Sequence, residues 1–398
     1  MDEAKIDNPA AGERRESHEG REGQLAAHLR PLVVKIGSST LTTSESKIDY
    51  AFLDDVARQV ARVREAGFSP IIVTSAAIAC GLEALGIERR PTDMPSLQAA
   101  ASVGQSALSA GYARAFAQHG ITTSLVLLTR RDTADRTAYL HARDTLSRLL
   151  EMEVVPIVNE NDTVSVEQIR FGDNDTLAAL VACLVEAKLM VILSDIDGLY
   201  DANPTKVEGA RLIERVERID ESIMGVAGDA GSAVGSGGMV TKIKAARVLM
   251  AAGIPMTICF GHAPDAIVRA VAGERIGTRF AASERPHEIT PRKLWIALGD
   301  SARGALIVDD GAKRALLHCG SSLLSVGISR VEGRFGVDDI VDVKDATGHV
   351  IARGRTAFSS DEVELARGRT REELERNRLL AAFADKPVIH RDELIAFE

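Results

Sequence analysis

The sequence is poor in aromatic residues and cysteine, and the spacing of its cysteines excludes two kinds of small scaffold. Aromatic side chains make up only 4% of the 398 residues, and there are four cysteines. The cysteines lie far apart and include no Cys-x-x-Cys pair, so we expect neither a disulfide framework nor a zinc site. We expect reduced, mostly buried thiols at Cys80, Cys183, Cys259 and Cys319.

Long apolar runs are also missing. No run reaches the roughly eighteen residues that suggest a membrane-spanning helix, and residues 1–30 lack the apolar segment of a signal peptide. The formal net charge of -9 argues against a general binder of nucleic acid or anionic membranes, because nothing neutralises phosphate in bulk. We therefore expect a cytoplasmic protein with no membrane segment.

The two commonest phosphate-binding fingerprints are absent. The chain contains no Gly-x-x-x-x-Gly-Lys-Ser/Thr motif, and no Gly-x-Gly-x-x-Gly motif follows a strand-like run. A Walker-type ATPase and a dinucleotide-binding fold of the usual kind are therefore not expected.

What the chain does contain indicates two folded domains. Residues 1–29 are rich in charge and poor in large apolar groups, so we expect a mobile extension. Residues 30–280 alternate apolar strand-like runs with helical patterns, which predicts an α/β three-layer sandwich with a mainly parallel sheet. Residues 289–398 hold short runs between closely spaced glycines, which is typical of a small β-rich domain.

Polar residues follow several of the predicted strands. Ser75, Asn159 to Asp162, and Ser194 with Asp195 each stand at the end of a different apolar run. Ligands of such sheets bind beyond the carboxyl ends of the strands, so these residues predict one shared site. Lys35 lies inside an apolar run, where a lysine is costly unless it has a partner or a function.

The stretch from 156 to 182 is the most polar part of this predicted edge. Gly172-Asp173-Asn174-Asp175 precedes an apolar helical pattern, where Asn and Asp also serve as ordinary helix caps. The residues alone therefore fit either a cap or a ligand site.

Two segments have the composition of a phosphate site. Lys35 precedes Gly37-Ser38-Ser39, and a glycine-rich stretch from 235 to 239 precedes Lys242. Glycines let backbone N–H groups approach phosphate oxygens, and a helix N-terminus adds positive potential. A flexible surface loop would show the same glycines.

The ordered motifs resemble glutamate 5-kinases of the amino acid kinase superfamily. They are Val-Val-Lys-Ile-Gly-Ser-Ser at 33, Val-Thr-Ser at 73, Asn-Glu-Asn-Asp at 159, Gly-Asp-Asn-Asp at 172, Asp-Gly-Leu-Tyr at 197 and Gly-Gly-Met-Val-Thr-Lys at 237. Gly-Ser-Ser-Leu-Leu at 320 and Val-x-Gly-x-Phe at 331 are similar to the PUA domain of bacterial members. The resemblance covers residues 31–398.

The resemblance implies the amino acid kinase fold and a reaction. The reaction would be ATP-dependent phosphorylation of the γ-carboxylate of L-glutamate to L-glutamyl 5-phosphate, the first step of proline biosynthesis, with Mg2+. A carboxylate is already ionised at neutral pH and needs no general base. By matching motif, Lys35 and Lys242 would contact the transferring phosphate and Asp175 would hold both lysines. Ser75, Asp162 and Asn174 would bind glutamate, and no protein ligand for the metal is assigned. The nucleotide would be bound by Lys35, Ser194, Asp195, Ser236, Gly237, Gly238, Met239, Val240, Thr241 and Lys242.

The resemblance also implies a homo-oligomer, dimer or tetramer, and feedback inhibition by proline. We do not expect RNA binding by the PUA-like tail, whose acidic and basic residues nearly balance. One departure concerns Ala76, which stands where the family usually has glycine; alanine would weaken the site if that position needs a positive φ.

Two other functions remain as alternatives. One is another carboxylate kinase of the superfamily, an N-acetylglutamate kinase or aspartokinase, although Asp162 suits a free amine better than an acylated one. The other is a non-enzymatic RNA-binding or regulatory protein with a degenerate kinase core. The presence of Lys35, Asp175 and Lys242 argues against it.

Overall fold

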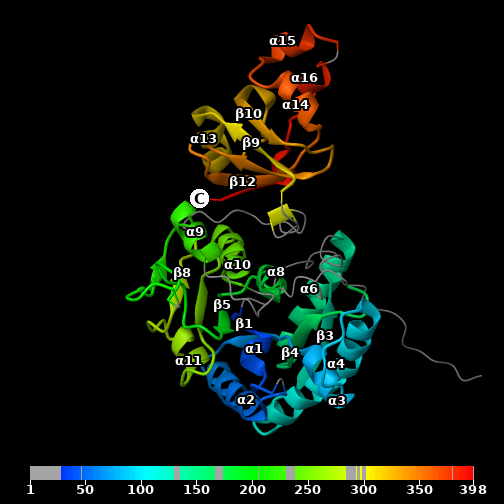
Figure 1. The fold of residues 1–398 in the computed structure, drawn as a ribbon, viewed down its shortest axis with the longest axis vertical. Coiled ribbons are helices and arrows are strands. Elements are labelled where there is room, and N and C mark those ends of the chain that lie inside the picture. The colour runs from blue at the N-terminus through cyan, green and yellow to red at the C-terminus, as the bar shows by residue number, and fades with distance from the viewer. Residues whose placement is uncertain are drawn as a thin grey trace, which may run out of the picture.

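The structure is a computed structural model that describes residues 28–45, 47–129, 135–165, 174–204, 206–229, 238–283, 293, 296–297, 302–378 and 380–397. Its strands form two separate sheets, the larger in the N-terminal part and the smaller in the C-terminal part (Figure 1). Of the extension expected at 1–29, residues 1–27 lie outside the described residues.

The larger sheet has eight strands in the order β3-β4-β2-β1-β5-β7-β8-β6. The strands are β1 (Pro31–Ile36), β2 (Ser69–Val73), β3 (Thr123–Leu128), β4 (Val155–Glu160), β5 (Leu189–Ser194), β6 (Arg215–Val216), β7 (Met256–Phe260) and β8 (Thr278–Phe280). Neighbouring strands are parallel except for the β7–β8 pair, which is antiparallel. The predicted three-layer α/β fold with a mainly parallel sheet is confirmed.

Helices cover both faces of this sheet (Figure 1). They are α1 (Ser38–Leu41), α2 (Tyr50–Glu65), α3 (Ala77–Ala84), α4 (Met94–Ala117), α6 (Arg136–Glu151), α8 (Asn174–Leu184), α9 (Glu221–Asp229), α10 (Met239–Ala251) and α11 (Ala266–Val271). One core cluster joins the sheet to α6, α8 and α10, and the other joins it to α2, α3, α4 and α11.

Local sequence explains where these helices lie. The side chain of Asp49 accepts a hydrogen bond from the Phe52 backbone N–H and caps α2, whose Leu53, Val56 and Val60 fall at helical spacing and are fully buried. Burying each such side chain contributes about 1.5–3 kcal/mol relative to exposure. An aspartate at Val56 would place an unpaired charge in this core and break the packing of α2.

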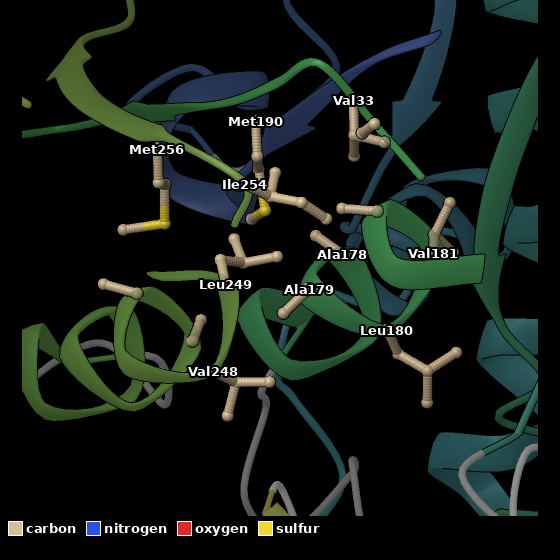
Figure 2. Packing of buried hydrophobic residues seen from close by; sticks show 14 of the residues in the cluster. Val33, Ala178, Ala179, Leu180, Val181, Met190, Val248, Leu249, Ile254 and Met256 are labelled. Carbon is tan, nitrogen blue, oxygen red and sulfur yellow. The ribbon is translucent and has the colours of Figure 1, made fainter. Parts of the chain in front are cut away.

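The core under α8 and α10 fixes the helices that enter the site. Figure 2 shows Val33 and Met190 of the sheet facing Ala178 of α8, with Leu249 of α10 beside them. All four are fully buried. Because α8 carries alanines here, its backbone can lie close to the strands, which places its first turn at the carboxyl ends of β1 and β2.

The smaller sheet has the order β10-β9-β11-β12-β13. The elements of this part are β9 (Gly304–Val308), α13 (Asp310–Cys319), η1 (Ser325–Gly327), β10 (Ile328–Gly333), β11 (Ile340–Lys344), β12 (Val350–Arg355), α14 (Ser360–Ala366), α15 (Arg371–Glu375), α16 (Ala382–Asp385), η2 (Arg391–Glu393) and β13 (Leu394–Ala396). They enclose a core of their own.

The two parts also touch. Ile395 and Phe397 belong to the core cluster that contains α8 and α10, and the guanidinium of Arg247 on α10 lies 3.7 Å from the centre of the Phe397 ring. The C-terminal part therefore packs directly on the helix that carries Lys242 (Figure 1). Within the part of the chain that the structure describes, no helix is long and apolar enough to cross a membrane.

Candidate active site

The strand order brings the predicted site residues to one edge. Strands β4, β2, β1 and β5 are consecutive neighbours, and all four are parallel, so their carboxyl ends meet. The chain goes from β1 to β2, β3 and β4 on one side and then crosses to β5 on the other side of β1, which makes β1 a topological switch point. Lys35 is the second-last residue of that strand.

Asp175 joins two lysines from different elements. Lys35 Nζ lies 2.7 Å from Asp175 Oδ1, and Lys242 Nζ on α10 lies 3.2 Å from Oδ2. Asp175 is fully buried, and each lysine is 6% exposed. The hydroxyl of Thr241 also donates to Asp175 Oδ2 at 2.7 Å. Lys35 thus has the partner that its buried position required.

Contact with the two lysines keeps the Asp175 carboxyl ionised. Burial alone would raise the pKa of Asp175, but the two lysines and the hydrogen bonds from Lys35 and Thr241 lower it to about 2. Two cations then share one anion at a buried site. The net positive charge of these three side chains would favour an anionic ligand, and the carboxylate keeps both ammonium groups in a defined place.

The first turn of α10 provides further donors. Its N-cap residue, Gly238, has no side chain to cap the helix, and the Thr241 N–H bonds to the Gly238 carbonyl, so among the described residues the N–H groups of Met239 and Val240 are left without a cap. Met239, Val240 and Thr241 follow, and Thr241 Oγ1, which donates to Asp175, lies 2.8 Å from the Gly238 carbonyl oxygen. The partial positive charge of the helix N-terminus adds to that of Lys242. Ser236 and Gly237 lie outside the described residues.

Ser194 and Asp195 stand where β5 ends, on the same side of β1 as α10. The Ser194 hydroxyl donates to Asp195 Oδ1 at 3.1 Å; Ser194 is buried and Asp195 is exposed. Thr40 in α1 donates to the carbonyl of Leu193 and ties the turn after β1 to this strand.

The three residues expected to bind glutamate lie on the other side of β1. Asn174 Nδ2 donates to Ser75 Oγ at 2.8 Å, to the Thr74 carbonyl and to Asn159 Oδ1 at 3.1 Å. Asn174 is the first residue of α8, so these hydrogen bonds join the start of that helix to the ends of β2 and β4. Asp173, the residue that would cap this helix, is outside the described residues.

Asp162 lies just beyond β4 and is 8% exposed. Burial raises the pKa of this carboxyl to about 6, against the opposing charge of Arg90. A buried carboxylate with a raised pKa is stabilised by a cationic ligand group.

Sequence comparison decides what kind of protein has this arrangement. The profile of the amino acid kinase family matches residues 30–259, and that of the PUA domain matches residues 304–377. Glutamate 5-kinase of Caldanaerobacter subterraneus is 44% identical over 92% of this chain and 98% of its own length. Those of Azoarcus and Streptomyces coelicolor are each 45% identical, over 92% and 94% of this chain and 98% of their own lengths. The chain belongs to the glutamate 5-kinase family.

As a glutamate 5-kinase family member, the chain is a kinase that uses ATP and performs the first step of proline biosynthesis. A solved carbamate kinase from Giardia lamblia bound to AMP-PNP aligns with a TM-score of 0.47 and 17% identity, covering 64% of this chain and 99% of that one. The assignment rests on the sequence relatives.

The candidate site includes two buried amides, Asn159 and Gln105, that received no individual role from the sequence. Asn159 is the second-last residue of β4 and belongs to the predicted polar stretch from Asn159 to Asp162, which was its signal in the sequence. Gln105 lies in the middle of the Ala-rich helix α4 and had no local signal at all. Its side chain contacts both Asn159 and Glu160.

Ala76, which stands where the family usually has glycine, adopts the positive φ that favours glycine. Its φ of 73° and ψ of 11° lie in the left-handed region, directly after Ser75 and before α3. This conformation costs an L-residue roughly 1–2 kcal/mol, and glycine avoids that cost.

Proposed function

We propose that the residues around Lys35, Asp175 and Lys242 transfer the γ-phosphoryl group of ATP to the γ-carboxylate of L-glutamate, giving L-glutamyl 5-phosphate and ADP. The observation that carries this proposal is the single buried carboxylate that holds two lysines at the edge where four parallel strands end.

In phosphoryl transfer to a carboxylate, the protein itself needs to do little covalent chemistry. The nucleophile is ionised at neutral pH, so no general base is required. The barrier falls when two anionic reactants are held together and the charge on the transferring oxygens is neutralised. Lys35 from β1 and Lys242 from α10 supply positive charge from two elements, and the first turn of α10 supplies N–H donors.

Asp175 acts through the lysines. Because its pKa is held near 2, it stays ionised at any physiological pH and keeps both ammonium groups in position before ATP arrives. The lysines therefore need little reorganisation during the reaction, which is the condition for effective electrostatic stabilisation.

Glutamate would occupy the side of the site formed by β2 and β4. Asp162, once ionised, would pair with the α-ammonium group, and that pairing would offset the burial that raises its pKa. Ser75 would donate to the substrate carboxylate. Asn174 would contribute by fixing Ser75, to which its amide donates.

The nucleotide would lie on the β5 side. Ser194 and Asp195 at the end of β5, and the segment from Ser236 to Lys242, would hold it, with Lys35 between nucleotide and glutamate. The order β2-β1-β5 supports this division, because β1, which carries Lys35, lies between β2 and β5.

Mg2+ would enter with ATP. Among the described residues no group of three or more His, Cys, Asp and Glu side chains could hold a metal, and the Asp175 carboxylate is occupied by two lysines. This donor set fits an ion carried by phosphate oxygens and water, as Mg2+ commonly is. When bound, the ion would neutralise charge on the phosphate oxygens.

The same proposal extends to the whole molecule. Residues 30–280 would be the catalytic domain and 289–398 the PUA-like domain, because each range contains one complete sheet. The enzyme would act in the cytoplasm, where its four free cysteines stay reduced, as a homo-oligomer inhibited by proline. Oligomerisation and proline inhibition are supported by the family resemblance alone.

Coupled assays of ADP release test the substrate. With ATP and Mg2+ present, L-glutamate should give a higher kcat/KM than L-aspartate or N-acetylglutamate, because Asp162 favours a free amine and the site must reach a γ-carboxylate. A higher kcat/KM for aspartate or N-acetylglutamate would show that this compound, and not glutamate, is the preferred substrate.

A further inference from the structure

Gln105 begins a chain of buried side-chain amides that reaches Ser75. Its Nε2 donates to the backbone carbonyl of Glu160 at 3.1 Å, and its Oε1 accepts from Asn159 Nδ2 at 3.1 Å. Since a carbonyl oxygen can only accept, the amide of Gln105 has one possible orientation. Gln105 is 7% exposed and lies on α4, outside the strand ends that form the site.

The next amide is fixed in the same way. Asn159 Oδ1 accepts from the backbone N–H of Glu160 at 2.9 Å, and an N–H can only donate. Asn159 must therefore direct Nδ2 to Gln105 and Oδ1 to Asn174. Asn159 is 2% exposed, so water does not compete for these bonds.

The third amide passes this orientation to Ser75. Asn174 Nδ2 has two hydrogens and faces the Thr74 carbonyl, Asn159 Oδ1 and Ser75 Oγ, all of which can accept. A hydroxyl that accepts from Asn174 keeps its own hydrogen free. Among the described residues that hydrogen has no acceptor, and Ser75 is half-buried, so its O–H can donate to a ligand.

Helix α4 is held firmly enough to act as the base of this chain. A Cβ placed on Gly104, the neighbour of Gln105, would lie 1.7 Å from the carbonyl oxygen of Ala77, so α4 touches the start of α3. Further along α4, the Tyr112 hydroxyl lies 2.8 Å from the hydroxyl of Thr74. Both contacts surround the Thr74-Ser75-Ala76 turn.

We propose that Gln105 is a positioning residue for glutamate binding: through Asn159 and Asn174 it orients the Ser75 hydroxyl to donate to the substrate carboxylate. This inference rests on the proposed role of Ser75. The simpler reading is that Gln105 only satisfies two buried polar groups between α4 and β4. The two readings predict different effects of a Gln105 substitution on the KM for glutamate in a variant that lacks the Ser75 hydroxyl.

A double-mutant cycle separates them. Ser75→Ala should raise the KM for glutamate about 10- to 100-fold, the effect of losing a hydrogen bond to a charged group. Gln105→Met, which fills similar space without polar atoms, should raise the same KM about 10-fold and leave kcat and the KM for ATP within about twofold. In the Ser75→Ala background, Gln105→Met should add less than about twofold.

The matched control is Gln59→Met. Gln59 is also a buried glutamine that bonds a backbone group, since its Oε1 accepts from the N–H of Ile267, but it joins α2 to α11. This variant should lose similar stability without a change in the KM for glutamate. If Gln105→Met and Gln59→Met change the KM equally, Gln105 has only the simpler role.

A conservative variant adds a pH readout and serves if Gln105→Met folds poorly. In Gln105→Glu, the neutral carboxylic acid can donate to the Glu160 carbonyl and accept from Asn159, whereas the ionised form loses the donor. Its KM for glutamate, divided by that of the wild type, should therefore rise with pH. A flat ratio overturns the proposal.

The outcomes also separate this inference from the proposed function. If Ser75→Ala leaves the KM for glutamate unchanged, the role of Ser75 is wrong and the inference falls with it. If Ser75→Ala raises the KM but the effects of Ser75→Ala and Gln105→Met multiply, glutamate binding by Ser75 stands and the orienting role of Gln105 is rejected.

Discussion

Lys35 Nζ lies 2.7 Å from Asp175 Oδ1, in an ion pair that joins the central strand β1 to the first turn of α8. The pair is buried, and Lys242 completes it from α10. Elements β1, α8 and α10 thus meet at one carboxylate. A change at Asp175 should therefore affect both folding and phosphoryl transfer.

Asp175→Asn should show both effects. Removing the anion leaves Lys35 and Lys242 as neighbouring buried cations, and breaking such a pair typically costs about 3–5 kcal/mol. We expect a loss of that order in the free energy of unfolding by urea, together with a large fall in kcat. A variant with unchanged stability and kcat would show that Asp175 does not hold the lysines.

The ion pairs of Asp175 also predict the acid limit of stability. Its pKa is lowered in the folded state to about 2, below the unfolded value of about 3.9, so its contribution is complete above pH 4 and is lost as the pH falls toward 2. Between these values Asp175→Asn should lose less stability with falling pH than the wild type. Parallel unfolding curves across this range would contradict the pKa shift.

Asp162 predicts a pH dependence of glutamate use. With a pKa of about 6 in the free enzyme, its carboxylate is protonated below that pH and can no longer pair with the α-ammonium group. The kcat/KM for glutamate should fall about tenfold for each pH unit below 6. Asp162→Asn should have a low kcat/KM that lacks this transition; retention of the transition would assign it to another group.

Ala76→Gly should relieve the strain at φ 73°. Glycine avoids the left-handed penalty but loses a buried methyl group and makes the unfolded chain more flexible, so the net gain in stability should be at most about 1 kcal/mol. We expect kcat/KM for glutamate to stay equal or rise. The control Ala77→Gly changes the next residue, which does not have positive φ, and should only destabilise. A large loss of activity in Ala76→Gly would mean that the methyl group shapes the substrate turn.

The contact between the two domains gives a further prediction. Burial lowers the pKa of Arg247 to about 10, with Arg353 acting in the same direction, and the guanidinium stacks on Phe397. Phe397→Ala should lower stability by about 3 kcal/mol, the usual cost of removing a buried phenylalanine. Leu324→Ala, at a residue 52% exposed, should change stability by less than about 0.5 kcal/mol. Equal effects would show that Phe397 does not contribute to the junction.

Much of the fold could be predicted because the strands are apolar on both faces. The burial of every residue of β1, β4 and β5 reflects helices on either side, which is the arrangement that continuous apolar runs indicate. The short strands β6 and β8 were not predicted, since two and three residues are too few to show a period. The β7–β8 pair is the one antiparallel pair in this sheet, among the residues that the structure describes.

The candidate site could likewise be predicted only in part. Lys35 stood out because a lysine in an apolar strand needs a partner, and Ser75 and Asp162 because they follow strands. Gln105 could not be found, since its contacts lie more than fifty residues away in sequence and α4 has no polar pattern around it. Long-range hydrogen bonds of this kind have no local signature.

The most direct measurement is glutamate-dependent ADP release by the wild type, Lys242→Ala and Lys244→Ala. Lys242 contacts Asp175, whereas Lys244 lies on the same helix and is exposed to solvent. We predict ATP turnover that requires glutamate, a fall of at least about 100-fold in kcat for Lys242→Ala, and a change of less than about twofold for Lys244→Ala. Turnover independent of glutamate, or equal in the wild type and Lys242→Ala, would contradict the account.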